Sequence, residues 1–110
     1  MGKSRRVTYD VVRALGLALP GVEESTSYGT PALKVKGKLI ARLKEDGETL
    51  VVIIGFEERN ALLDADPETF YITDHYLNYP SVLVRLPKVR RAVMRGLLEL
   101  AWQRVAPKAP

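Results

Sequence analysis

The alternation of apolar and polar side chains is clearest in one short stretch of the chain. Leu33 and Val35 alternate with lysines before Gly37, and the same period-two pattern resumes after it, which predicts a hairpin of two half-buried strands. Gly37 stands where a tight turn needs a residue that tolerates positive φ. The strands are expected near residues 31–36 and 39–44, with one apolar face and one positively charged face.

The register of this hairpin depends on the length of its loop. A three-residue loop from Lys36 to Lys38 would set Val35 opposite Leu39 and Leu33 opposite Ala41. The pattern alone does not choose between this register and its neighbours, although each leaves one face apolar.

Similar patterns predict the remaining elements. Five strands are expected, near residues 31–36, 39–44, 48–56, 69–73 and 81–86. Three helices are expected, near residues 8–19, 57–65 and 87–107. The run from Leu50 to Ile54 has no polar alternation, which predicts a central strand covered on both faces. Residues 22–30 are expected to form a connection, of which 26–28 could pair as a short strand end.

The order of these elements indicates the fold class. Strands come in hairpin-linked runs, so the sequence predicts an α+β fold, α-β-β-β-α-β-β-α, with a mainly antiparallel five-stranded sheet and helices packed against it. We expect residues 1–110 to form a single domain, with residues 1–6 as a basic flexible arm.

Composition excludes several classes of protein. The apolar and charged fractions, 46% and 27%, are those of an ordinary soluble globular protein. No apolar run approaches the length of a membrane-spanning helix, and the first residues lack the apolar core of a secretory signal. We therefore expect no membrane partner and a cytoplasmic protein. The chain has no cysteine, so disulfides and cysteine metal sites are excluded.

Charge is distributed in blocks along the chain. Residues 1–44 contain nine Lys/Arg and three Asp/Glu, a net charge of +6, and residues 85–110 contain seven and one, again +6. Residues 45–84 contain one Lys/Arg and nine Asp/Glu, a net charge of −8. Such a chain folds either with a basic and an acidic face or with the blocks mixed.

Few residues offer catalytic or metal-binding chemistry. His75 is the single histidine and follows Asp74, but adjacent side chains in an extended segment point apart, so we expect a loop histidine rather than a general base. Asp64, Asp66 and Glu68 lack the turn glycine and distal glutamate of a calcium loop, and we expect no metal site. Neither glycine pattern of nucleotide-binding loops is present, which argues against nucleotide-dependent catalysis and an organic cofactor.

Three tyrosines lie around one predicted loop. Tyr71, Tyr76 and Tyr79 could stack on unpaired bases beside a basic surface, but packing of the rings with an exposed hydroxyl is the commoner arrangement. Trp102 lies next to the apolar stripe of the last predicted helix and is expected in the core.

The lysine-rich face of the hairpin is the best candidate site. A β-ribbon fits a DNA groove, and its cations can neutralise phosphates without recognising bases, whereas the alternative is an edge protected by lysine against aggregation. The N-terminal arm and the last helix contribute further cations. The candidate nucleic-acid-binding residues are Lys34, Lys36, Lys38, Arg42, Lys44, Arg5, Arg6, Arg90, Arg91 and Arg95.

Four segments resemble the MmcQ/YjbR-like family. They are Leu19-Pro20-Gly21-Val22-Glu23-Glu24, Gly29-Thr30-Pro31-Ala32-Leu33-Lys34-Val35, Gly37-Lys38-Leu39-Ile40-Ala41, and the closing motif Ala101-Trp102-Gln103-Arg104-Val105-Ala106-Pro107-Lys108. Their order and spacing carry the resemblance from the first helix to Lys108. Ser81 departs from the family, in which an aromatic residue is expected before the fifth strand.

The resemblance implies a compact α+β domain, similar to secretion chaperones and to the frataxin-like fold. The family is described as DNA-binding through its likeness to a "double wing" domain, which is an analogy at the level of fold. No catalytic residue set comes with it. Iron binding in frataxin-like proteins uses an acidic first helix, and the first helix here offers only Asp10.

These observations lead to two hypotheses of different classes. The first is a non-enzymatic domain, expected to be monomeric, that binds DNA through a basic sheet face, mainly by phosphate contacts. The second is a protein-interaction or secretion-chaperone-like module with no nucleic-acid role.

Overall fold

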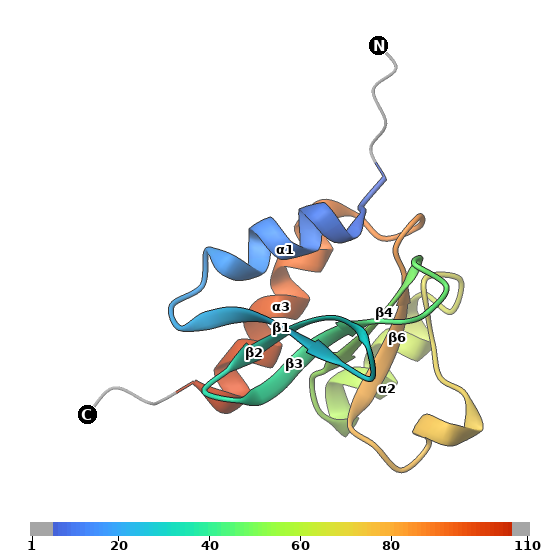
Figure 1. Cartoon of the computed structure of the whole chain (residues 1–110). Coiled ribbons are helices and arrows are strands. Elements are labelled where there is room, and N and C mark those ends of the chain that lie inside the picture. Colours follow the sequence, from blue (N-terminus) through green and yellow to red (C-terminus); the bar gives the residue numbers. More distant parts are fainter. Residues whose placement is uncertain (1–5, 107–110) are drawn as a thin grey trace.

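The computed structural model describes residues 6–106, which form an antiparallel sheet with helices on one face (Figure 1). The fold is α+β, as predicted. The strands are β1 (Val22–Ser27), β2 (Thr30–Val35), β3 (Lys38–Leu43), β4 (Thr49–Ile53), β5 (Phe70–Tyr71) and β6 (Ser81–Arg85). They lie in the order β1-β2-β3-β4-β6-β5, and every pair of neighbours is antiparallel.

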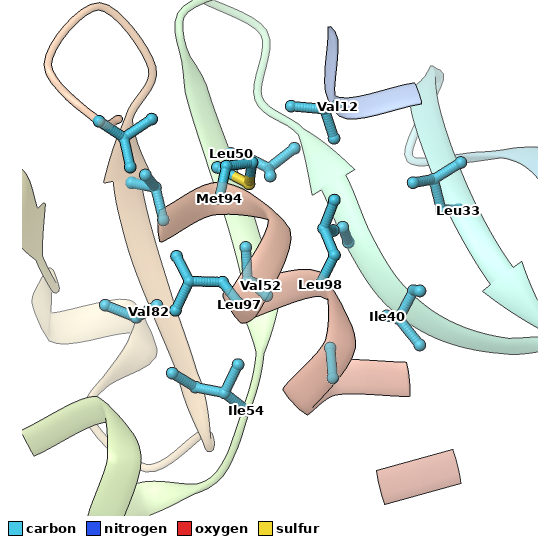
Figure 2. Close-up of a cluster of buried hydrophobic side chains, with 14 of the residues drawn as sticks. Val12, Leu33, Ile40, Leu50, Val52, Ile54, Val82, Met94, Leu97 and Leu98 are labelled. Atoms are coloured by element: carbon cyan, nitrogen blue, oxygen red, sulfur yellow. The ribbon is translucent and has the colours of Figure 1, made fainter. Parts of the chain in front are cut away.

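Three α-helices, α1 (Tyr9–Leu17), α2 (Phe56–Ala65) and α3 (Arg91–Val105), complete the fold, together with the short 3-10 helix η1 (Asp74–Tyr76). Helix α3 packs on α1, β3 and β4, and its Met94 and Leu98 enter the main hydrophobic core (Figure 2). Helix α2 packs against β5 and β6 at the other end of the sheet. No helix within residues 6–106 is long and apolar enough to cross a membrane.

The sheet has six strands rather than the predicted five. The additional strand, β1, pairs with β2 over its whole length, from Val22 opposite Val35 to Ser27 opposite Thr30. Its sequence, Val-Glu-Glu-Ser-Thr-Ser, has no apolar alternation because it is an edge strand. Backbone hydrogen bonds to β2 hold it, and these bonds leave no pattern in the side chains.

The β2–β3 hairpin differs from its predicted register near the turn. Leu33 does lie opposite Ala41, but Val35 faces Lys38 because the loop has two residues instead of three. Both loop residues, Lys36 and Gly37, have positive φ, at 51° and 80°, as a tight hairpin turn requires.

A β-bulge reconciles the short turn with the predicted pairing further along the hairpin. The register shifts between Leu33 and Lys34, and β3 accommodates one extra residue, Ile40. As a result, Ile40 and Ala41 are consecutive and both belong to the main core.

Strand β4 is the central strand that its apolar run predicts. Leu50 and Val52 belong to the main core beneath α3, and Val51 is buried on the opposite face. Two other elements, α3 and β5, are shorter than predicted. Helix α3 begins at Arg91 instead of Pro87, since residues 86–88 form a turn, and the strand expected at 69–73 has only two residues.

Trp102 differs from its predicted core position. It is half-buried at the edge of the main core, and its indole Nε1 donates a hydrogen bond of 2.7 Å to the carbonyl oxygen of Pro20. This bond ties the C-terminal end of α3 to the turn between α1 and β1, and it gives the buried part of the ring a polar partner.

Candidate nucleic-acid interface

The tip of the β2–β3 hairpin presents two of the predicted lysines to solvent. Lys36 and Lys38 are exposed on either side of Gly37, and neither forms an ion pair within residues 6–106. Lys34 is half-buried on the sheet face opposite the helices, because Leu33 and Val35 on either side of it enter the core. The hairpin therefore presents its charge mainly at the turn rather than along the strands.

Arg42 is buried, in contrast to the solvent-facing position expected for it. Its side chain has 7% of its surface exposed and packs over the ring of Tyr28, whose centroid lies 5.1 Å from Cζ. Its Nη1 donates to Thr30 Oγ1 at 3.0 Å and approaches Glu45 Oε2 at 3.5 Å. The guanidinium thus links the β1–β2 and β3–β4 connections through Nη1, which has its partners inside the protein.

Two more cations on this sheet face also lie against aromatic rings. Lys44 is half-buried, with its Nζ 5.5 Å from the ring centroid of Tyr76, and Arg85 Cζ lies 4.0 Å from that of Tyr71. Of the loop tyrosines, Tyr76 and Tyr71 are half-buried, and Tyr79 is 52% exposed. These cation–π contacts fit the expected packing of the rings and leave Tyr79 as the most accessible of the three.

A second group of cations gathers at the N-terminal end of α3. A cleft of about 680 Å³ lies between the residues before α1 and the turn that leads into α3, and its charged lining residues are Arg6, Lys88, Arg90 and Arg91. Arg95 is exposed one turn further along the helix. Arg5 lies outside the described residues.

The two groups of cations lie at opposite ends of α3 (Figure 1). The hairpin tip follows Val35, which pairs with Val22 beside the turn that Trp102 contacts at the C-terminal end of the helix. Arg91 is the first residue of this 15-residue helix, which is about 22 Å long. The predicted cations therefore do not converge on a single sheet face.

The acidic side chains of α2 lie in the half of the molecule away from the hairpin. Glu57, Glu58 and Asp64 are on α2, which packs against β5 and β6, and the hairpin belongs to β2 and β3. Within residues 6–106 the ion pairs are Arg42 with Glu45, and Arg13 Nε with Glu24 Oε1 at 2.8 Å. The latter hydrogen bond lowers the pKa of Glu24.

The residues considered for catalysis and metal binding have other contacts. His75 packs edge-on against Tyr76, with ring centroids 4.8 Å apart. Asp66 Oδ1 accepts a hydrogen bond of 3.3 Å from the backbone N–H of Thr69, which closes the turn through Pro67. No group of three or more His, Asp or Glu side chains within residues 6–106 is arranged to hold a metal ion.

Arg59, the only cation among residues 45–84, has a structural role that was not predicted from the sequence. This α2 residue is 6% exposed, and its Nη1 donates to the carbonyl oxygens of Tyr76, Leu77 and Tyr79 at 3.2, 3.1 and 2.9 Å. Lys88 and Arg85 were also missed. For Arg59, its isolation among nine acidic residues was the available signal.

Both the fold and the distribution of charge define a small α+β domain with one helical layer and cationic groups at two ends. The family model for YjbR matches residues 17–104, and the chain belongs to this family. This confirms the resemblance derived from the four sequence segments. No curated protein matches the chain.

A solved structure extends the comparison of the fold. The chain is similar to the crystal structure of Deinococcus radiodurans protein DR2400, which has a DUF419 domain, with 24% sequence identity and a TM-score of 0.77. The match covers 98% of this chain and 84% of that protein. At this identity the likeness concerns the fold alone.

Proposed function

We propose that this YjbR-family domain binds DNA without catalysing a reaction on it, and that most contacts are made to backbone phosphates. A set of exposed cations without carboxylate partners within residues 6–106 carries the proposal: Lys36, Lys38, Lys88, Arg90, Arg91 and Arg95. Charges that are already neutralised inside a protein gain little from a phosphate, whereas these cations would release counterions from DNA on contact.

The burial of Arg42 changes how the hairpin contributes to this function. Arg42 holds neighbouring connections in place, and Lys36 and Lys38 at the turn make the phosphate contacts, with Lys34 and Lys44 behind them on the sheet face. A two-residue turn is narrow enough to enter a groove of the duplex. In a bacterial-type cell, a monomer with this role would work in the cytoplasm, where the DNA is.

A salt titration with a charge-matched control tests the proposal. The test variant is Lys36→Asn/Lys38→Gln, because asparagine tolerates the positive φ at position 36. The control is Ala61→Glu/Ala65→Glu, which lowers the net charge equally at exposed positions on α2. Binding of a labelled duplex is measured by fluorescence anisotropy at several salt concentrations.

We expect the hairpin variant to bind more weakly and to reduce the slope of log K against log salt by about 2, close to 0.9 per phosphate contact. The control should retain the wild-type slope, since its charges lie on the half of the molecule away from the hairpin. Absence of binding at low salt would refute the proposal, and equal binding by the wild type and the hairpin variant would refute the role of the turn.

A protein-interaction module is the second candidate function, and one observation favours it. Phe56, Leu77 and Tyr79 are 46%, 54% and 52% exposed, and all three lie around Arg59, which packs over Phe56 and bonds the other two. Exposed apolar side chains in one place are typical of contact surfaces. A partner protein that stays bound to the wild type after nuclease treatment but does not bind the Leu77→Ser variant would support this candidate. Binding of that partner to the variant would count against it.

A further inference from the structure

The cleft at the start of α3 has an unusual lining for a surface depression. Among residues 6–106, the charged residues that line it are all cationic, Arg6, Lys88, Arg90 and Arg91, and no acidic side chain does so. Its remaining lining is apolar and consists of three valines and a proline. At about 680 Å³ the cleft falls within the range of small-molecule sites, roughly 300–1,000 Å³.

At the start of helix α3, these cations do not stabilise the free protein. Arg90 is the N-cap residue, no side chain within residues 6–106 caps the helix, and its first turn contains no acidic residue. The N-terminal end of a helix carries a partial positive charge and unpaired N–H groups, so cations there repel the helix dipole. Lys88, Arg90 and Arg91 have no ion pair within residues 6–106 that would offset this repulsion. An anion in the cleft would relieve it.

The size and lining of the cleft indicate the class of anion. A phosphate monoester carries a charge of about −1.5 to −2 and three acceptor oxygens, whereas a backbone diester carries a single charge. Several cations around one cleft therefore favour the monoester. The valine-lined wall adds an apolar surface beside the charges, which suits a sugar or a base attached to the phosphate.

We propose that this cleft binds the phosphomonoester of a nucleotide. Two sources share this chemistry, namely a free mononucleotide and the 5′-phosphorylated end of a DNA strand. The second source rests on the DNA-binding function proposed above, and the first does not. The role is binding, with no bond made or broken.

The test follows backbone amide resonances of residues 88–93 by NMR. Deoxyadenosine 5′-monophosphate, deoxyadenosine and sodium chloride are titrated separately, followed by a short single strand with either a 5′-phosphate or a 5′-hydroxyl. We expect saturable shifts with the monophosphate, none with the nucleoside, and tighter binding of the phosphorylated strand.

Arg90→Ser is the diagnostic variant, because serine is a preferred N-cap residue. It should raise the melting temperature while weakening binding of the monophosphate by about tenfold or more, the loss of one charge-assisted hydrogen bond. Gln103→Glu changes the net charge equally near the other end of α3, at an exposed position outside the cleft, and should retain wild-type binding. A stabilised variant with impaired binding cannot be explained by misfolding.

Each outcome separates the cleft from the DNA-binding function. Monophosphate binding without any DNA binding would support the cleft and refute the proposed function. DNA binding that ignores the 5′-phosphate, together with no response to the monophosphate, would refute the cleft and leave the function intact. Chloride shifts equal to those with the monophosphate would also refute binding in the cleft. Equal affinity of Arg90→Ser and Gln103→Glu for the monophosphate would refute it as well.

Discussion

Replacing Arg59 with methionine would remove the side chain that holds the loop from Tyr76 to Tyr79 against α2. The aliphatic part of methionine can still pack beside Phe56, so the substitution tests mainly the polar contacts. Three of these contacts run from one nitrogen, Nη1, to carbonyl oxygens that follow or end the 3-10 helix η1, and Nε donates a further hydrogen bond of 3.1 Å to Oδ1 of the exposed Asn60. Carbonyls at the end of a helix favour a nearby cation.

The expected loss of stability follows from this geometry. Nη1 has two protons for three acceptors, so one proton is shared, and the contacts are worth two hydrogen bonds rather than three. A hydrogen bond to a charged group contributes about 1.5–3 kcal/mol. Burying the guanidinium has a desolvation cost, and the carbonyls of the exposed Leu77 and Tyr79 can be rehydrated, so we expect a net loss of about 2 kcal/mol.

Urea denaturation and amide hydrogen exchange together measure this effect. The midpoint of unfolding should fall, and exchange at the N–H groups of Leu77 and Tyr79, which bond to Asp74 and Tyr76, should accelerate. Arg95→Met is the control, since Arg95 is exposed and has no ion pair within residues 6–106; it should change stability by less than about 0.5 kcal/mol. An unchanged midpoint combined with unchanged exchange in Arg59→Met would refute the structural role of this residue.

Three further predictions concern stability. Gly16→Ala should destabilise the protein by about 1–3 kcal/mol in thermal or urea unfolding, because the added Cβ would overlap Leu33 Cδ1; Gly96→Ala, with open space around it, should stabilise α3 by up to about 1 kcal/mol. Burial raises the pKa of Asp46, but hydrogen bonds from the following residues outweigh it and hold the pKa below its ordinary value. The ionised Asp46 carboxylate therefore stabilises the folded state. Its contribution is complete above the ordinary carboxyl pKa of about 3.9 and is lost as pH falls through the lower folded value, and Asp46→Asn should flatten that part of the stability profile. Trp102→Phe should lose about 1 kcal/mol with its hydrogen bond to the α1–β1 turn, and equal melting temperatures would contradict this.

Local patterns in the chain were sufficient for most of the architecture. Period-two alternation and turn residues located β2 and β3, and an unbroken apolar run located the central strand β4. Amphipathic spacing located α1 and α3 to within a few residues, and start and stop signals located α2. These features are predictable because burial of one face imposes its period on neighbouring residues of the same element. The order and spacing of short motifs were enough to indicate the family.

Strand β1 and the hairpin bulge depended on contacts between elements. Apart from Val22, the side chains of β1 are polar and lie exposed or half-buried at a sheet edge, so no apolar period marks it, and only its pairing with β2 makes it a strand. The bulge at Ile40 depends on the two-residue turn at Lys36-Gly37 and on the pairing of Leu33 with Ala41, which together leave one extra residue in β3.

The candidate sites show the same division. Sequence alone identified which residues are cationic and that they lie in two blocks, since charge is a property of composition. Tertiary structure decided that Arg42 is buried against Tyr28, that Arg59 bonds a loop 17 to 20 residues away, and that Arg90 and Arg91 line a cleft. A side chain's partners depend on which segments the fold brings together, and that information does not reside in the period of any single element.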